Sequence, residues 1–178
     1  MKHHDFIRTY QALTPTVCDG LISLFNDNSE RHIRNDNNTM LFTEFNVTKH
    51  VDDLTGLLVQ AVMNALDKYL EDTVKYNQFL PPPYQMEEFR IKRYLGDTDE
   101  QFRWHSDVGD IHSAKRYLAL LFYLNDDYDE GETEFVDMLV TPKKGDVLIF
   151  PPTWQYAHRG LPPINGDKYI MSSYLNYT

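Results

Sequence analysis

The sequence predicts a mainly β domain with helices that support its core. Two observations lead to this fold class. The spacing of apolar residues is helical in the first part of the chain and becomes strand-like after the three prolines at positions 81–83. The chain of 178 residues is also long enough for one buried core and too short for two ordinary domains. We therefore expect a single domain over residues 1–178, with helical support in 1–80 and the β core in 85–178.

Two helices are expected before the prolines. Thr14 and Pro15 are typical of an N-cap and a first helical residue, and apolar residues follow at helical spacing. A second helix should begin at Asp52 or Asp53, because one apolar stripe runs from there to Tyr69. The Asn- and Asp-rich segment 28–40 between these helices is expected to be a loop or a mobile flap.

Six strands are expected after the prolines, in segments rich in aromatic or branched residues and bounded by Gly, Pro or Asp. These segments are 85–94, 102–108, 116–125, 133–140, 147–150 and 169–177. Residues 117–124 are apolar at every position, so this strand should lie in the middle of a sheet that is covered on both faces. Several short strands of this kind predict a β-sandwich or a barrel.

Composition excludes some functional classes. A formal net charge of -10 argues against binding to a phosphate backbone, which requires Lys and Arg. The single cysteine, Cys18, cannot form an internal disulfide and is expected to be buried in a helix. No stretch has the length and apolar character of a signal peptide or a membrane helix. We expect a soluble, cytoplasmic protein that binds neither nucleic acid nor membrane; the oligomeric state is not predicted.

The motif His105-Ser106-Asp107 is the first candidate for chemistry. Strand side chains repeat every second residue, so on the expected strand His105 and Asp107 share a face with Arg103. Phe102, Trp104, Ser106 and Val108 should then lie on the opposite, core face. Taken alone, this short motif also fits an ordinary hydrogen-bonded pair on a solvated strand.

His158 and Lys168 change this interpretation. A catalytic mononuclear metal normally has three protein ligands, and His158 follows an expected strand and can supply the third. Two histidines and one carboxylate, with positions left open, are the ligands of non-heme Fe(II) oxygenases. Lys168 lies ten residues after His158 and begins a strand on which Ile170, Ser172 and Tyr174 alternate onto the same face. Its ammonium group can pair with an acidic co-substrate in the same pocket.

The other histidines compete with His158 for the third position. They are expected to be surface residues, because none lies on an expected strand that faces the pocket. They are His3, His4, His32, His50 and His112.

The ordered set of motifs resembles the prolyl 4-hydroxylase-like group of Fe(II)- and 2-oxoglutarate-dependent dioxygenases. The matching stretches, in chain order, are 13–22, 93–94, 105–107, 123–125, 130–135 and 144–146, followed by His158 and Lys168. The match spans nearly the whole chain. The resemblance implies a double-stranded β-helix (jelly-roll) core supported by N-terminal helices, with Fe(II) held by His105, Asp107 and His158.

The resemblance also implies a binding site for 2-oxoglutarate. In the family, this co-substrate chelates the iron through its 2-oxo acid end, and its far carboxylate pairs with a lysine at the position of Lys168. Tyrosines at the positions of Tyr94 and Tyr123 help to hold it.

Two positions depart from the family. Gly131-Glu132 stands where the family often has a double glycine, so the turn there is expected to differ in shape. Tyr174 stands where several prolyl hydroxylases have a tryptophan near the peptide substrate, which keeps an aromatic wall and leaves the substrate open.

The function implied is hydroxylation of a prolyl residue in a peptide or protein. The reaction consumes dioxygen and 2-oxoglutarate and releases succinate and CO2, with ascorbate as a supporting reductant. Segments 28–40 and 96–101 are candidates for substrate loops. Three alternatives remain open: the same chemistry on a small molecule such as a free amino acid, the same chemistry on a modified nucleobase, or a jelly-roll module that binds without catalysis.

Overall fold

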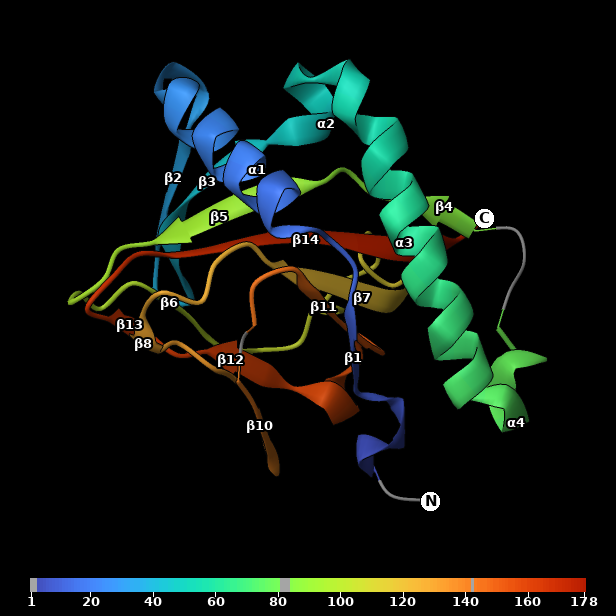
Figure 1. Cartoon of the computed structure of the whole chain (residues 1–178). Helices are drawn as coiled ribbons and strands as arrows, with labels where there is room; N and C mark the ends of the chain where they lie inside the picture. The colour runs from blue at the N-terminus through green and yellow to red at the C-terminus, as the bar shows by residue number, and fades with distance from the viewer. Residues whose placement is uncertain (1–2, 81–83, 142) are drawn as a thin grey trace.

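The computed structural model describes residues 3–80, 84–141 and 143–178. The two longest helices, α1 and α3, lie on one side of a strongly curled sheet (Figure 1). The helices are η1 (His3–Phe6), α1 (Pro15–Asp27), η2 (Ser29–Arg31), α2 (Val47–His50), α3 (Asp52–Asp72), α4 (Val74–Asn77) and η3 (Trp154–Tyr156). In chain order, the strands of the first two thirds of the chain are β1 (Arg8–Gln11), β2 (Ile33–Asp36), β3 (Met40–Asn46), β4 (Tyr84–Met86), β5 (Arg90–Tyr94), β6 (Gln101–His105) and β7 (Arg116–Tyr123). The remaining strands are β8 (Asp129–Glu130), β9 (Thr133–Phe135), β10 (Met138–Val140), β11 (Asp146–Phe150), β12 (His158–Gly160), β13 (Pro163–Ile164) and β14 (Lys168–Tyr177).

The strands of the described residues pair antiparallel, in the order β1-β11-β7-β14-β5-β3-β6-β12-β9-β10. β2 adds to β3, β4 adds to β14, and β8 and β13 form a separate two-stranded ribbon. Phe135 on β9 packs in one buried cluster with Ala119 on β7, Phe150 on β11 and Ile170 on β14. Strands far apart in the pairing order therefore face one another, and the sheet curls around an interior.

The central strands are buried on both faces, as predicted for residues 117–124. On β7, Leu118, Leu120 and Phe122 belong to the cluster under the helices, whereas Ala119 and Tyr123 belong to the interior cluster. Adjacent residues point to opposite faces of a strand, so an apolar residue at every position is required when helices cover one face and the curled sheet covers the other.

The two predicted helices form where their sequence signals place them. Thr14 caps α1 through its side-chain oxygen, which accepts a hydrogen bond of 3.4 Å from Val17 N, and Pro15 is the first helical residue. α3 begins at Asp52. Cys18 lies in α1, as predicted, and its side chain is fully buried in the apolar cluster between the helices and the sheet. The apolar stripes of both helices pack on the outer face of the sheet, above β5, β14 and β7 (Figure 1).

The prediction of a loop over 28–40 is wrong. This segment contains η2, strand β2 and the start of β3, which pair as a hairpin. Asn37 Oδ1 accepts hydrogen bonds of 2.9 Å from the backbone N–H groups of Thr39 and Met40, so the turn itself is confined to residues 37–39 between the two strands. Residues 1–80 thus supply strands β1, β2 and β3 to the sheet in addition to helices.

Two predicted strands are interrupted. Segment 133–140 is a hairpin of β9 and β10 that reverses at Val136 and Asp137. Segment 85–94 is broken between β4 and β5, where the backbone N–H and C=O groups of Phe89 bond to Thr48 Oγ1 and Val47 N. A short turn ends the first predicted strand, and hydrogen bonds from another element end the second. Residue composition indicates neither interruption.

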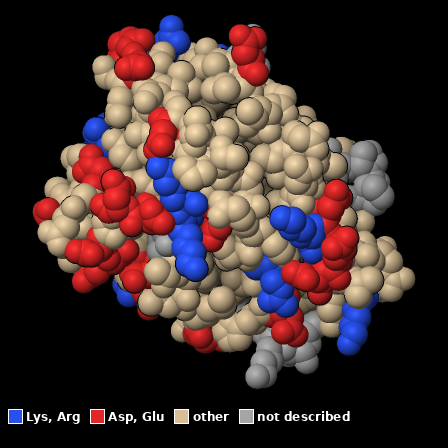
Figure 2. All heavy atoms as spheres, in the orientation of Figure 1, with Lys and Arg blue, Asp and Glu red and all other residues tan. Residues whose placement is uncertain are grey.

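Charged side chains are unevenly spread on the surface. On the face drawn in Figure 2, Asp and Glu gather at the left edge, where β8 and β13 lie in Figure 1. Lys and Arg on this face are interspersed with acidic groups. Among the described residues, no helix combines the length and apolar character needed to span a bilayer. The expected absence of nucleic-acid and membrane partners stays a prediction.

Candidate functional site

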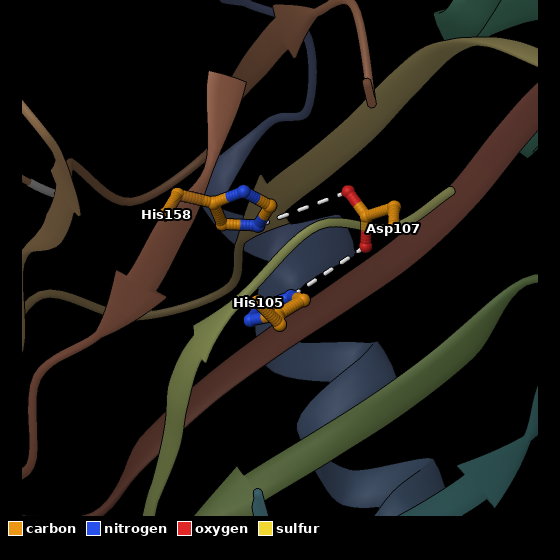
Figure 3. Close-up of side chains that lie close together, drawn as sticks. All are labelled: His105, Asp107 and His158. Atoms are coloured by element: carbon orange, nitrogen blue, oxygen red, sulfur yellow. Dashed lines mark ion pairs between the residues drawn. The ribbon is translucent and has the colours of Figure 1, made fainter. Parts of the chain in front are cut away.

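His105, Asp107 and His158 meet inside the curled sheet. His105 is the last residue of β6 and His158 the first of β12, and the two are directly paired across these strands. Asp107 lies two residues beyond the end of β6, and its carboxylate faces both imidazole rings (Figure 3). Its oxygens lie 3.6 Å from His105 Nε2 and 3.8 Å from His158 Nε2. Each of the three residues offers one potential ligand atom, and these atoms lie within 4.8 Å of one another. Among the described residues, these three side chains form the cluster that could hold a metal ion.

The faces predicted for this strand are wrong on two points. Phe102 lies in the pocket with His105, and Trp104 is 44% exposed instead of buried in the core. Trp104 lies on the face opposite His105, as alternation requires, but that face is the outer surface beside Arg159 and not the core. Phe102 changes face because of a β-bulge: between the pairs His158–His105 and Gly160–Phe102, β6 has three residue steps and β12 has two. An extra residue shifts the alternation, and Phe102 therefore stacks on the His105 ring, with ring centroids 3.5 Å apart.

Asp107 is held by contacts with distant strands, because it lies outside the sheet ladder. Tyr174 on β14 donates a hydrogen bond of 2.7 Å to Asp107 Oδ1, and Arg116 on β7 donates one of 3.0 Å to its backbone oxygen. Arg116 also forms two hydrogen bonds of 2.8 Å with the carboxylate of Glu87, and its guanidinium lies 3.8 Å from the centroid of the Tyr174 ring. These contacts fix the direction of the Asp107 carboxylate.

The donor atoms have the orientation that a divalent metal requires. The Nδ1 atoms of His105 and His158 lie 2.7 Å and 3.1 Å from the backbone oxygens of Arg103 and Tyr156. Each Nδ1–H can donate to its carbonyl, which leaves the lone pair of each Nε2 directed at the shared space. His105 Nε2 is buried and has no hydrogen-bond partner. A buried polar atom without a partner is costly, and a metal ion at this point would satisfy it.

The electrostatics of the group agree with this donor set. Burial lowers the pKa of His158 to about 4, so the ring is neutral at physiological pH and free to act as a ligand. Burial alone would raise the pKa of Asp107, but the facing imidazole groups of His105 and His158 lower it below its usual range. A carboxylate and two imidazoles fit Fe(II) in a three-ligand site with open positions.

Lys168 lies in the same cavity, which we call the inner pocket. Its side chain is 2% exposed and donates a hydrogen bond of 2.5 Å to the backbone oxygen of Gly131. Burial lowers the pKa of its ammonium group to about 7. Tyr94 stands opposite Lys168 in the β5–β14 pairing, and the Lys168 Nζ atom is 5.4 Å from the centroid of its ring. The inner pocket thus has a metal-ligand group on one wall and a buried cation on another.

The departure at Gly131-Glu132 keeps the one glycine that the turn requires. Gly131 has φ +70, and a Cβ there would lie 2.6 Å from the ring of Tyr128. Its carbonyl is the one that accepts the Lys168 hydrogen bond. Glu132 needs no such freedom, so the turn forms with a single glycine.

The two remaining predicted tyrosines have different surroundings. Tyr123 does not line the inner pocket; its hydroxyl lies 2.8 Å from Thr133 Oγ1, and Thr133 lines the pocket. Tyr174 does line the pocket, where its hydroxyl donates a hydrogen bond to Asp107.

The competing histidines lie away from the pocket. His50 and His112 are exposed, His4 lies 3.3 Å from Asp137, and His32 stacks on Phe25 with ring centroids 4.0 Å apart. The side chain of His3 is outside the described residues.

Sequence reasoning missed several residues of the site. Lys92 lies on β5 and lines the inner pocket, Phe102 stacks on a proposed ligand, and Arg116 orients Asp107. The available signal for Lys92 was its position two residues before Tyr94, which puts both side chains on one face of an expected strand. Nothing local to Arg116 indicates its role, because Glu87 and Asp107 reach it from other elements.

A wider groove opens from the inner pocket toward solvent, and we call it the outer groove. It has a volume of about 420 Å³. It shares Lys92, Phe102, His105, Asp107, Ser172 and Tyr174 with the inner pocket. Its other walls are Asn37, Thr39, Met40, Phe42, Glu44, Glu87, Glu88, Arg90, Ser106 and Arg116. The turn of the β2–β3 hairpin and the start of β3, in the segment predicted to be a flap, therefore line the entrance through Asn37, Thr39 and Met40. The other candidate loop, 96–101, is anchored by the buried Glu100, which pairs with Arg34.

Replacing Tyr174 by phenylalanine is expected to weaken metal binding by about tenfold or more. The change removes the hydrogen bond that orients Asp107 and keeps the ring under Arg116. Metal titration of the two proteins measures the effect. Tyr177→Phe, on the same strand and 52% exposed, is the matched control. Equal metal affinity of Tyr174→Phe and the control would show that Asp107 needs no such support.

Residues 89–176 match the family model of the 2OG-Fe(II) oxygenase superfamily. The matched segment contains all three residues of the metal-ligand group, and Lys168. This segment, about half of the chain, is a 2OG-Fe(II) oxygenase segment. Fe(II) and 2-oxoglutarate, the predicted cofactors, are the two that the name of the superfamily states.

Relatives of this oxygenase include prolyl hydroxylases. It is 26% identical over 200 residues to Prolyl 4-hydroxylase 2 of Arabidopsis thaliana, a match that covers 92% of this chain and 64% of that protein. The chain thus spans less than two thirds of the length of that relative.

Two solved structures resemble the whole oxygenase chain. One is the 2OG complex of the viral collagen prolyl hydroxylase from Paramecium Bursaria Chlorella virus-1, with 20% identity, a TM-score of 0.69 and 97% of each chain covered. The other is a prolyl-4-hydroxylase of Pseudomonas putida, with 15% identity, a TM-score of 0.73 and coverage of 97% of this chain and 92% of that one. At these identities the similarity shows the fold, and it confirms the predicted double-stranded β-helix core with supporting helices.

Proposed function

We propose that this protein is an Fe(II)- and 2-oxoglutarate-dependent dioxygenase that hydroxylates a prolyl residue in a peptide or protein. The observation that carries the proposal is the presence, in one inner pocket, of a buried two-histidine, one-carboxylate group and a buried lysine. Either feature alone has an ordinary structural explanation. Together they provide a ligand set for the metal and a counter-charge for a dicarboxylic co-substrate.

His105, Asp107 and His158 would hold the iron, and the rest of the site keeps them in place. Their Nδ1 contacts with backbone oxygens set the ring orientation, and the Tyr174 hydrogen bond sets that of the carboxylate. When bound, iron and 2-oxoglutarate supply the oxidising chemistry that converts a C–H bond to C–OH with dioxygen, releasing succinate and CO2. No side-chain acid or base is required, so Asp107 is assigned as a ligand.

Lys168 would bind the far carboxylate of 2-oxoglutarate. Its ammonium is buried and has only a carbonyl oxygen as a hydrogen-bond acceptor among the described residues, so a carboxylate would compensate the cost of burying the charge. Tyr94 and Thr133 line the same part of the pocket and offer hydroxyl groups. Phe150 and Ile170 form apolar walls that exclude water from the reacting groups.

A peptide substrate is supported by the outer groove. This groove is open to solvent and reaches His105 and Asp107, so an extended chain can bring one residue to the metal from outside. The prolyl assignment rests on the relatives, which carry the name prolyl 4-hydroxylase or prolyl hydroxylase.

The test is a turnover assay with Fe(II), 2-oxoglutarate, ascorbate and a panel of proline-containing peptides. Succinate should form only when iron is present, and a product peptide should gain the mass of one oxygen atom. Peptides with alanine in place of proline are the control for the target residue. Absence of iron-dependent succinate, with every peptide and without peptide, would contradict the proposal.

A further inference from the structure

A second buried lysine, Lys92, lies between the proposed metal site and the outer groove. It is 8% exposed and lines both cavities. In the β5–β14 pairing Tyr94 stands opposite Lys168, and Lys92 stands opposite Ile170. Side chains two residues apart on a strand share a face, and the step between them is roughly 7 Å. Lys92 therefore lies about 7 Å along β5 from the end of the inner pocket that holds Lys168, on the side that opens into the outer groove.

Two aromatic rings lie near the Lys92 ammonium, and no ion pair joins it to a carboxylate in the described part of the chain. Its Nζ atom is 5.3 Å from the ring centroid of Phe42 and 5.5 Å from that of Phe102. Burial lowers its pKa below the ordinary value for lysine. A buried ammonium in such surroundings is costly unless an anion accompanies it.

The nearest carboxylates are engaged elsewhere. Glu44 stands opposite Lys92 in the β3–β5 pairing, but its carboxylate lies 3.7 Å from Arg90. Asp107 faces the two imidazole rings and accepts the hydrogen bond of Tyr174. Both carboxylates act on Lys92 through their charge and raise its pKa in part, but neither forms an ion pair with it.

The other cations of the outer groove already have partners. Arg90 pairs with Glu88 at 2.7 Å, and Arg116 pairs with Glu87 at 2.8 Å. Within the described residues that line the groove, Lys92 is thus the cation left for an incoming anion. Its place beside the proposed ligands means that this anion would lie close to the reacting carbon.

We propose that Lys92 recognises a carboxylate of the substrate, so that the hydroxylated residue either has an acidic neighbour or is itself the carboxyl-terminal residue. This inference rests on the proposed function and narrows its substrate class. Lys168 is assigned to the far carboxylate of 2-oxoglutarate. Lys92 also borders the outer groove, the route by which a peptide would enter. A charge-assisted hydrogen bond at this point would select acidic over neutral peptides.

Binding of matched peptides tests the proposal without turnover. The protein is loaded with Zn(II) and N-oxalylglycine, an unreactive analogue of 2-oxoglutarate, and titrated with fluorescent peptides that contain one proline. One pair has Asp or Asn beside the proline, and a second pair ends in prolyl carboxylate or prolinamide. The wild-type protein should bind the acidic member of at least one pair about tenfold more tightly. The pair that shows the preference identifies the source of the carboxylate.

Three variants establish whether Lys92 is responsible. Lys92→Met, which keeps the length and apolar contacts of the side chain, should remove the preference, and Lys92→Arg should retain it. Lys115→Met, at an exposed site, should leave the preference unchanged. Glu44→Gln should also retain it. Equal binding of both members of each pair by the wild-type protein would overturn the inference, as would a preference that survives in Lys92→Met.

A second measurement separates the substrate from the co-substrate. Affinity for 2-oxoglutarate should change by less than about threefold in Lys92→Met and fall strongly in Lys168→Met. An equal loss in both variants would assign Lys92 to the co-substrate and overturn the inference. Because peptide binding requires no reaction, absence of succinate would reject the proposed function while leaving the measured preference to decide the role of Lys92.

Discussion

Replacing His105 by alanine is expected to abolish iron retention and, with it, succinate formation. The change removes the Nε2 atom that is buried without a partner and one of three ligand atoms within 4.8 Å of one another. Loss of a residue that only orients a metal ligand costs roughly 10–100-fold in affinity, so loss of the ligand itself should exceed this range. Iron content after anaerobic reconstitution and gel filtration measures the effect.

The control for this variant is His112→Ala, a histidine at an exposed position on the loop after Asp107. It should retain iron like the wild-type protein. The ring of His105 also stacks on Phe102, so a thermal unfolding curve of His105→Ala is needed to show that the fold persists. A folded His105→Ala protein with undiminished iron would contradict the assignment of the ligands.

Replacing Lys168 by methionine is expected to raise the concentration of 2-oxoglutarate that the protein requires by about 30-fold or more. The ammonium is fully enclosed, and truncating one partner of a buried charge pair costs about 2–5 kcal/mol. Iron binding should persist, because Lys168 does not belong to the metal-ligand group. The KM for 2-oxoglutarate, taken from succinate formation in the absence of peptide, measures the effect.

Lys168→Arg and Lys115→Met complete this comparison. Arginine keeps the charge and should restore part of the affinity, whereas the exposed Lys115 should have no influence. An unchanged KM in Lys168→Met would show that the co-substrate is held elsewhere in the pocket.

Local patterns were sufficient to predict the elements whose signals are contained in a few neighbouring residues. Thr14 and Pro15 predict the start of α1, and the stripe from Asp52 to Tyr69 predicts α3, because capping and helical spacing act within one or two turns. The strand from Lys168 was predicted for the same reason, since its pocket face alternates without interruption through Tyr174. The ordered resemblance to a family brought the distant His158 into the same hypothesis.

Features that depend on pairing between distant strands were not predicted. The bulge in β6 is invisible in the sequence, because it is defined by the register with β12; it places Phe102 beside His105. The hydrogen bond between Tyr174 and Asp107 joins residues 67 positions apart. Lys92 shares the pocket face of β5 with Tyr94, but its place between the metal-ligand group and the outer groove depends on the surrounding strands. Sequence thus indicated the proposed ligands, and the structure was required to find what orients them and what surrounds the substrate.

Anaerobic titration of the metal-free protein with Fe(II) and then 2-oxoglutarate tests most directly whether these residues form one site. The visible charge-transfer absorption of an iron-bound 2-oxo acid should appear only when both are present and should saturate at one iron per chain. It should be absent in Asp107→Ala and should require far more 2-oxoglutarate in Lys168→Met. No absorption in the wild-type protein, or an undiminished one in Asp107→Ala, would contradict a joint site for iron and 2-oxoglutarate at His105, Asp107, His158 and Lys168.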